Sequence, residues 1–257
     1  MSEATFLFDE GGHKNILLAE VSGAGEAVQA NHHLIIHNSG SMILDPGGPA
    51  VFNKVMSEVM GAVPGGNLSH IFLSHQDPDI VAATNGWLLA TDATAYVSKL
   101  WTRFVPHVVP SLRDGGGFSG RLKGIPDEGM LLDLDGAKLV VVPAHYLHSS
   151  GNFQIYDPVS KILYTGDLGA SLGMDYREVP DFDAHIQYME GFHKRYMPSS
   201  AALKAWAKLA RKLDIEILAP QHGALMRGKP MVESFIAWCE SLTCGIDALG
   251  ELSLPSS

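Results

Sequence analysis

Cysteine is scarce in this sequence, which limits both the cross-links and the metal ligands that the chain can use. There are two cysteines, Cys239 and Cys244, among 257 residues. We expect both on one C-terminal helix, where positions five apart point to different faces, so they are predicted to be buried free thiols rather than a disulfide. Free thiols suit the reducing cytosol, and we expect a cytoplasmic protein. With twelve histidines against two cysteines, any bound metal is expected to have imidazole and carboxylate ligands.

The chain also has few positive charges and no long apolar run. Eighteen Lys and Arg oppose 28 Asp and Glu, giving a formal net charge of −10. There is no basic patch, so a phosphate backbone or an anionic bilayer would repel the surface, and neither nucleic acid nor membrane is an expected partner. No run approaches the roughly 18 apolar residues of a membrane span, and residues 1–4 lack the features of a signal peptide.

The sequence does contain enough apolar residues for a well-packed core. Hydrophobic residues make up 46% of the chain and charged residues 18%, which excludes intrinsic disorder. A length of 257 residues fits one large domain, so we expect residues 1–257 to fold as a single domain.

Apolar runs and turn residues outline two β-rich halves. Residues 1–50 carry four short apolar runs separated by glycine-containing turns, the pattern of a β-meander. A predicted strand at 71–74 ends at His75, and a predicted strand at 215–219 leads to His222 in the same way. This repetition favours an α+β fold in which helices cover two sheets, an αββα sandwich.

Three further segments complete the expected organisation. Residues 106–129 are rich in proline and glycine and are predicted to form a loop or lid. Residues 199–213 have the periodicity of an amphipathic helix, and residues 230–249 are predicted to form a closing C-terminal helix. Residues 191–198 show no clean periodicity.

The strongest local signal for chemistry is His75-x-Asp77-x-Asp79, which follows a buried strand. Ionisable side chains at such a place are costly unless something neutralises them, and a divalent cation is the strongest partner available. The alternative is that Asp79 caps the next helix while His75 and Asp77 are exposed in a loop. Three more strand ends each carry a residue able to bind a metal, namely His148, Asp167 and His222. Together they favour a metal site at one edge of the sandwich.

These segments resemble the metallo-β-lactamase fold superfamily across nearly the whole chain, from the β-meander to the Pro-Gln-His-Gly sequence at 220–223. Hydrolases of this superfamily carry His-x-His-x-Asp-His in the first ligand loop, whereas residues 75–80 read His-Gln-Asp-Pro-Asp-Ile. A carboxylate in the second ligand position is similar to the di-iron branch, the flavodiiron and oxygen-binding di-iron proteins. Residues 147–153 and 164–167 are similar to the oxygen-binding group. The resemblance implies a four-layer αββα sandwich of the metallo-β-lactamase type.

By this resemblance the chain would hold two metal ions. The implied ligands are His75, Asp77 and His148 for the first ion, Asp79 and His222 for the second, and Asp167 as a bridge between them. Three carboxylates and three imidazoles form a hard, oxygen-rich set that suits two iron ions (Fe2+/Fe3+), with zinc or manganese as alternatives.

The position after Asp79, usually histidine in the di-iron pattern, is Ile80, which cannot bind a metal. The second ion is therefore expected to be more open than the first. His145 is an alternative ligand at that ion, although we expect it to lie around the site instead, as we do for Tyr146 and His193. The adjacent pair at 32–33, both histidines, is predicted to consist of packing or edge residues.

The resemblance implies a non-haem di-iron protein that binds dioxygen or NO and can reduce it. The chain shows no phosphate-binding loop like that of the flavodoxin-like domain of flavodiiron proteins, so we expect a sensor, a carrier or a reductase that depends on a separate electron donor or signalling protein. A homodimer through residues 185–198 and the C-terminal helix is also expected. Two functions stay open beside this one: a hydrolase that uses a metal-bound hydroxide on a thioester, lactone or phosphoester, and a non-catalytic binding module.

Overall fold

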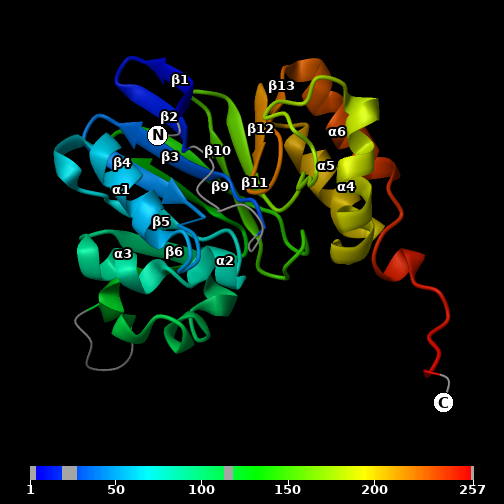
Figure 1. Ribbon diagram of the computed structural model, residues 1–257, viewed down its shortest axis with the longest axis horizontal. Coiled ribbons are helices and arrows are strands. Elements are labelled where there is room, and N and C mark those ends of the chain that lie inside the picture. The colour runs from blue at the N-terminus through cyan, green and yellow to red at the C-terminus, as the bar shows by residue number, and fades with distance from the viewer. Residues whose placement is uncertain (1–3, 19–27, 113–117, 256–257) are drawn as a thin grey trace.

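Two β-sheets packed face to face form the centre of the protein, as the computed structural model shows for residues 4–18, 28–112 and 118–255 (Figure 1). The seven-stranded first sheet has the order β1-β2-β3-β4-β5-β6-β7, and the six-stranded second sheet has the order β13-β12-β11-β10-β9-β8. The first contains β1 (Thr5–Glu10), β2 (His13–Leu18), β3 (His32–His37), β4 (Gly40–Leu44), β5 (His70–Phe72), β6 (Thr94–Ser98) and β7 (Leu122–Ile125). The second contains β8 (Met130–Leu134), β9 (Ala137–Pro143), β10 (Phe153–Asp157), β11 (Ile162–Gly166), β12 (Ile217–Pro220) and β13 (Met226–Arg227).

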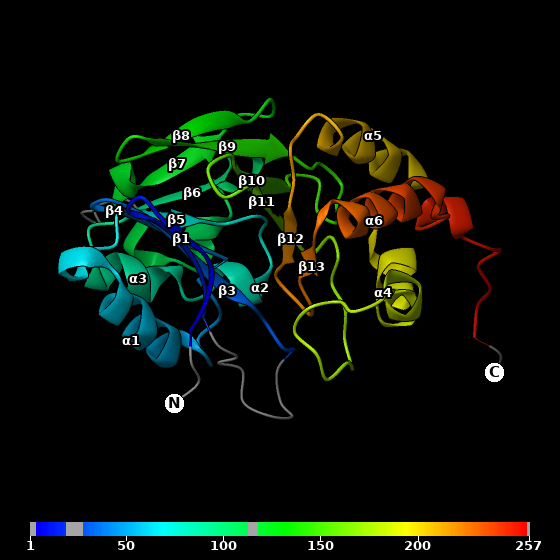
Figure 2. The ribbon, with the colours of Figure 1, turned by 90° about the horizontal axis from the view of Figure 1, so that it is seen from above.

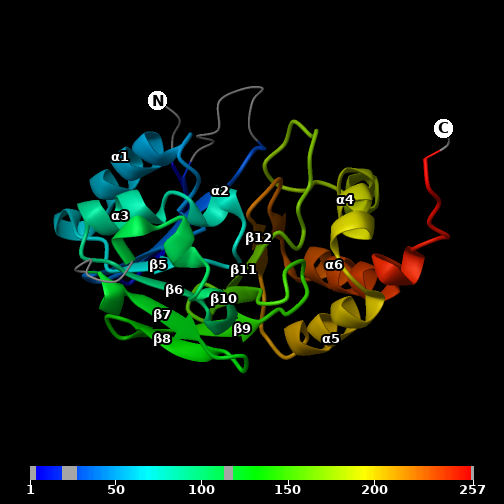
Figure 3. The same ribbon diagram turned by 90° about the horizontal axis from the view of Figure 1, so that it is seen from below.

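Helices cover the outer face of each sheet, with α1 and α3 beside the first and α4, α5 and α6 beside the second (Figures 2 and 3). Their bounds are α1 (Phe52–Ala62), α2 (Pro78–Val81), α3 (Thr84–Ala90), α4 (Phe182–Tyr196), α5 (Ser200–Ala210) and α6 (Lys229–Ser241). The layer order confirms the predicted α+β fold and its αββα sandwich. None of the helices in the described residues is both long and apolar enough to cross a membrane.

Successive side chains of the strands point in turn to the core between the sheets and to the helices outside, which accounts for the four layers. In β4, Met42 and Leu44 lie in the core between the sheets, whereas Ile43 lies in the core under α1 and α3. In β11, Tyr164 lies between the sheets and Leu163 lies under the helices of the second sheet. Successive side chains of a strand point to opposite faces, so a strand that is apolar at every position needs cover on both sides.

Several elements agree with the sequence-based expectation. The strands β1 to β4 pair antiparallel in chain order, which confirms the β-meander, although residues 19–27 between β2 and β3 lie outside the described part. The helix expected at 199–213 is α5, and its N-terminus is capped by Ser199, whose hydroxyl accepts from the Ala202 N–H.

The segment 106–129 needs a correction, because much of the expected loop or lid is regular structure. It holds short 3₁₀ turns and the strand β7, which pairs in parallel with β6; residues 113–117 lie outside the described part. The Arg121 guanidinium ties the segment to α3 and to the connection from α3 to β6, since it donates to the carbonyls of Leu88, Thr91 and Ala93. The prolines and glycines that predicted a loop lie within and between these short elements.

The C-terminal helix is also shorter than the expected 230–249, because α6 ends at Ser241. The chain then turns at Gly245, where φ is +53° and a β-carbon would lie 2.1 Å from the Pro198 carbonyl oxygen, so glycine is required. Cys239 lies in α6 and Cys244 lies beyond it. Both are buried and free, as predicted, although they do not share one helix.

Helix α4 was not expected from the sequence. It begins after Asp181, whose carboxylate accepts from the Ala184 N–H at 2.9 Å. Its fully buried side chains, His185, Met189 and His193, recur every four residues along one face. Phe182, Ile186 and Phe192 pack beside them, so the helix has an apolar face at helical spacing that the two histidines interrupt.

Candidate metal centre

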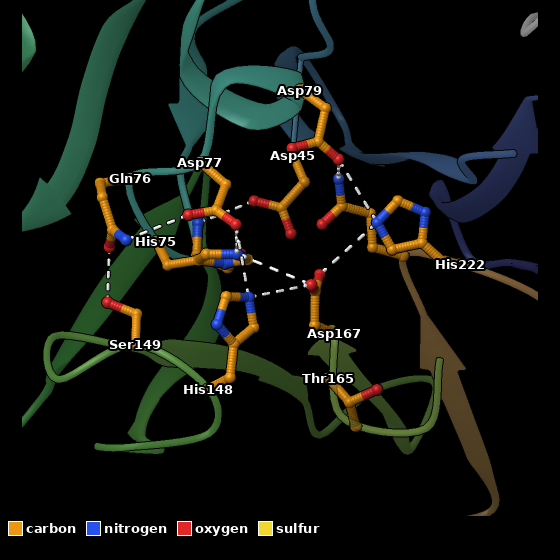
Figure 4. A network of polar contacts seen from close by, with 12 residues as sticks. Asp45, His75, Gln76, Asp77, Asp79, His148, Ser149, Thr165, Asp167 and His222 are labelled. Carbon is orange, nitrogen blue, oxygen red and sulfur yellow. Dashed lines mark hydrogen bonds and ion pairs between the residues drawn. The ribbon is translucent and has the colours of Figure 1, made fainter. Parts of the chain in front are cut away.

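All six residues implied as metal ligands meet at one edge of the sandwich, and they come from both sheets (Figure 4). Three follow β5 of the first sheet: His75, Asp77 and Asp79. Three belong to loops of the second sheet: His148 between β9 and β10, Asp167 after β11, and His222 after β12. The site therefore exists only when the two sheets are packed together.

Four of the six form a tight group. One ligand atom from each of His75, Asp77, His148 and Asp167 lies within 4.8 Å of the others. Oδ2 of Asp77 is 3.6 Å from Nε2 of His75 and 3.4 Å from Nε2 of His148. Oδ2 of Asp167 is 3.2 Å from Nε2 of His148 and 3.8 Å from Nε2 of His75. These four atoms surround one position.

The second group uses the other oxygen of the same carboxylate. Oδ1 of Asp167 lies 3.7 Å from Nε2 of His222, and that nitrogen is 3.4 Å from Oδ2 of Asp79. Asp167 therefore presents one oxygen to each group, which is the arrangement of a carboxylate that bridges two cations.

The pKa values at the site show that protons and a cation would compete for the same atoms. Burial disfavours the charged form of His148, but hydrogen bonds and charges from Asp167 and Asp77 raise its pKa to about 9. Burial likewise opposes the charge of His222, and Asp79 with Asp167 raises its pKa to about 9. Burial alone would raise the pKa of Asp167, yet its hydrogen bond with His148 brings it below the usual value. A cation would take over the role of these protons.

Two polar atoms at the site test whether metal ions would fit. Nε2 of His75 and Oδ1 of Asp167 are buried and have no hydrogen-bond partner. An unsatisfied buried group costs about 1–3 kcal/mol, and a cation in each group would remove that cost. Imidazole nitrogens and carboxylate oxygens are the donor set that iron, manganese and zinc accept. The residues therefore fit a pair of divalent ions.

Hydrogen bonds behind the candidate ligands hold them in place. Nδ1 of His75 lies 2.9 Å from the Ser74 hydroxyl, and Nδ1 of His222 lies 2.6 Å from the carbonyl oxygen of Gln29. The backbone N–H of Ser74 donates to Asp45 at 2.7 Å, and burial raises the pKa of that carboxyl to about 6. Metal-binding histidines are oriented by such bonds to the second ring nitrogen.

Comparison with known proteins identifies the family. The family model described as "ODP family beta lactamase" matches residues 28–223, a span that contains all six residues of the site. The chain belongs to the ODP family.

Two solved ODP structures are similar over almost their whole length. The structure described as the peroxy diiron species of the chemotaxis sensor ODP has 36% identity and a TM-score of 0.83, and the match covers 95% of this chain and 97% of that one. The apo state of the chemotaxis sensor ODP from T. denticola has 34% identity and a TM-score of 0.83, with 96% and 98% covered. None of the curated proteins matches the chain.

A more distant likeness extends beyond the ODP family. The rubredoxin oxygen:oxidoreductase from the anaerobe Desulfovibrio gigas has a TM-score of 0.78 at 13% identity, and the match covers 93% of this chain but 61% of that one. At this identity the likeness concerns the fold alone. With the family match, it confirms the metallo-β-lactamase type of sandwich.

Ile80 of this ODP-family chain does not face the site. Its side chain is fully buried in the core on the outer side of the first sheet. The second group therefore has three candidate ligands, Asp79, Asp167 and His222, against the four of the first group. The second group therefore has one candidate ligand fewer than the first, which leaves it the more open of the two.

The three residues expected around the site have different places. His145 hydrogen-bonds through Nε2 to the Asp127 carbonyl oxygen at 2.8 Å, and Tyr146 is 55% exposed; neither joins the six. His193 is fully buried and supports the site from behind. Its Nδ1–H donates to the Met189 carbonyl, and its Nε2 accepts from the N–H of Gly169, in the loop that carries Asp167.

A cavity of about 730 Å³ opens over the site. Besides the candidate ligands, its wall is largely apolar and includes Pro49, Val51, Ala170, Leu172, Phe192 and Tyr196. Phe192 and Tyr196 of α4 set their rings edge-on to His148, with centroids 6.3 and 5.8 Å away. Such a wall limits access of water and leaves room for a small ligand.

His32 also lines this cavity, so the expectation that it is a packing or edge residue is incomplete. The adjacent His33 turns its ring toward Tyr164 between the sheets. Because neighbouring residues of a strand point to opposite faces, His32 must point the other way. The sequence contains the pair but does not show which member faces the site.

Proposed function

We propose that this chain is a non-haem di-iron protein that binds dioxygen, with NO as an alternative ligand. The observation that carries the proposal is the bridging placement of Asp167, with one oxygen toward each group of candidate ligands. Membership of the ODP family supports iron as the metal, because a similar ODP is described as a peroxy diiron species. Residues 1–257 would act as one domain, since both sheets supply ligands.

Each residue then has a defined task. The first iron would be held by His75, Asp77 and His148, the second by Asp79 and His222, and both by Asp167. A di-iron pair supplies two electrons and adjacent coordination positions for a diatomic ligand. Around it, the rings of α4 keep the cavity apolar, and the three carboxylates offset most of the charge of two divalent ions.

The biological role that we favour is sensing, storage or partner-dependent reduction. Similar proteins are described as a chemotaxis sensor and as a rubredoxin oxygen:oxidoreductase. A separate electron donor or signalling protein would complete any of these roles. We place the protein in the cytoplasm on the evidence of its free buried thiols. A homodimer that uses α4 and the C-terminal region is supported by exposed apolar side chains there, among them Tyr196, Ile246 and Leu249.

The proposal is tested by loading the protein with Fe(II) under anaerobic conditions and recording its optical spectrum before and after adding O2. We expect about two irons per chain and a new visible charge-transfer band. Persistence of the band would indicate a sensor or carrier, and rapid decay a reductase. Protein that excludes Fe(II), or holds it without reacting, would contradict the proposal.

The size of the cavity supports a second candidate, metal-dependent hydrolysis. Its volume of about 730 Å³ falls in the range of pockets that take organic ligands, and a metal-bound hydroxide could attack a thioester, lactone or phosphoester there. Turnover of such substrates by zinc-loaded protein, lost in Asp167→Ala, would favour hydrolysis over dioxygen binding.

A further inference from the structure

His32 has a ring nitrogen that no part of the described chain satisfies. The residue opens strand β3, is 1% exposed, and lines the cavity together with Asp79, Asp167 and His222. Its Nδ1 lies 3.1 Å from the carbonyl oxygen of Asp45, whereas its Nε2 is buried without a hydrogen-bond partner.

The hydrogen bond to Asp45 determines what Nε2 can do. A carbonyl oxygen can only accept, so Nδ1 carries the proton and Nε2 carries a lone pair. Burial keeps the ring neutral by lowering the pKa of His32 to about 4. His222 shows the same arrangement, with Nδ1 against the Gln29 carbonyl oxygen. This is how histidines that bind metals are usually oriented.

Unpaired ring nitrogens also occur in other histidines, but His32 differs from those in its position at the cavity. Among the described residues, the other histidines with a buried nitrogen that lacks a partner are His33, His75, His145 and His185. None of these four histidines is part of the cavity wall. His75 already belongs to the first group of ligands, so His32 is the one that faces the second.

The turn at Gly47 and Gly48 lies between the ring of His32 and the loop of Asp79. A β-carbon at Gly47 would lie 3.0 Å from Cε1 of His32, and one at Gly48 would lie 3.6 Å from the Cα of Asp79. The turn between β4 and α1 has no side chain at these two positions and separates His32 from Asp79. The lone pair of His32 and the Asp79 carboxylate both only accept, and a cation between them would satisfy both.

We propose that Nε2 of His32 is a further ligand of the second metal ion, beside Asp79, Asp167 and His222. The assignment rests on the two-metal centre proposed above. It gives the second half a fourth protein ligand, from β3, in place of the one that Ile80 cannot supply.

The test is a titration of wild-type protein, labelled with 15N-histidine, with Zn2+, followed by NMR of the ring nitrogens. We expect the 15N chemical shift of His32 Nε2 to leave the range of an unprotonated, unbound nitrogen while that of His222 Nε2 also changes, and the shifts of the His33 nitrogens to stay as they are. A change in the chemical shift of His222 Nε2 without one at His32 Nε2 would overturn the assignment and leave the two-metal centre standing. A chain that never binds a second zinc ion would overturn both.

A pair of variants gives an independent readout. His32→Ala should weaken binding of the second zinc ion by at least the roughly 10- to 100-fold that loss of an orienting residue costs, and should leave the first unchanged, as measured by competition with a chelator. His33→Ala, the matched control, removes a neighbouring buried histidine and should leave both affinities unchanged. Equal affinities in His32→Ala and wild type would overturn the assignment.

Discussion

At the scale of single residues, Asp167 has the greatest influence on the site. It is almost fully buried, and its two oxygens face different histidines, His148 at 3.2 Å and His222 at 3.7 Å. A buried carboxylate between two imidazoles would be strongly disfavoured without positive charge around it. The same property makes it the residue whose loss would affect both halves at once.

Replacing Asp167 should therefore remove both metals rather than one. In Asp167→Ala we expect metal content to fall from two ions per chain to nearly none, as measured by elemental analysis after desalting. Asp175→Ala, a change in the loop that follows, is the control and should keep two. Retention of one tightly bound ion in Asp167→Ala would show that the carboxylate is not a bridge.

Protons on the histidines should make metal binding depend on pH. His148 and His222 have pKa values of about 9, above the usual 6.5, so both are protonated at pH 7 when no metal is bound. Loading at pH 7 should release up to about two protons per chain, and the affinity should rise between pH 7 and pH 9. Calorimetry in buffers of different ionisation enthalpy measures the release. Binding without proton release would contradict these pKa values.

The same pKa values bear on the stability of the protein without metal. Because the folded-state pKa of both histidines is raised, their stabilising effect is fully present below about pH 6.5 and is lost as the pH rises through about 9. Metal-loaded protein should not show this loss, since the imidazoles are then deprotonated and bound.

At the scale of elements, helix α4 supports the loop that follows β11. His193 accepts the N–H of Gly169 at 2.9 Å, and its other nitrogen is bonded within the helix to Met189 at 2.8 Å. Its ring packs against Trp238 of α6, with centroids 5.0 Å apart. The loop that carries Asp167 is thus held by α4, which also accepts the N–H of Leu172 at the carbonyl oxygen of Tyr188.

Replacing His193 with leucine should weaken metal binding without removing a ligand. We expect both affinities to fall by about tenfold, because residues that orient ligands typically contribute 10- to 100-fold. His185→Leu is the matched control, since His185 is buried in the same helix but bonds to the hydroxyl of Tyr176. A similar loss of affinity in both variants would mean that the effect comes from general loosening of α4.

At the scale of the whole molecule, a second polar cluster joins the two sheets. Asp157 of β10 is fully buried and accepts from Asn15 of β2 at 2.8 Å and from Ser160 at 2.9 Å. His13 of β2 lies 2.6 Å from the same oxygen. Burial would raise the pKa of Asp157, but these partners lower it overall, so the cluster stabilises the fold at neutral pH and loses that effect in acid.

Removing this carboxylate should destabilise the packed sheets. We expect Asp157→Ala to lower the free energy of unfolding by about 3 kcal/mol, because it leaves buried partners unpaired. Asp9→Ala breaks an exposed ion pair with Lys14 and should cost less than about 1 kcal/mol. Urea denaturation measures both. Similar small losses would show that the cluster contributes little to holding the sheets together.

The sequence by itself determined the candidate ligands and the class of fold. Each of the six residues follows an apolar strand within a few positions, as His75 follows β5 and Asp167 follows β11. Such signals are local, because an apolar run and the polar residue that ends it are neighbours in the chain. The β-meander and helix α5 were predictable for the same reason.

Only the tertiary structure decided what surrounds those ligands. The hydrogen bond between His32 and Asp45 joins residues 13 positions apart, and that between His193 and Gly169 joins residues 24 positions apart. Two histidines of helix α4 are fully buried only because the second sheet and α6 pack against that face, and β7 is a strand because β6 lies beside it. A polar side chain becomes buried, paired or free only when distant segments pack, and no local pattern in the sequence contains that information.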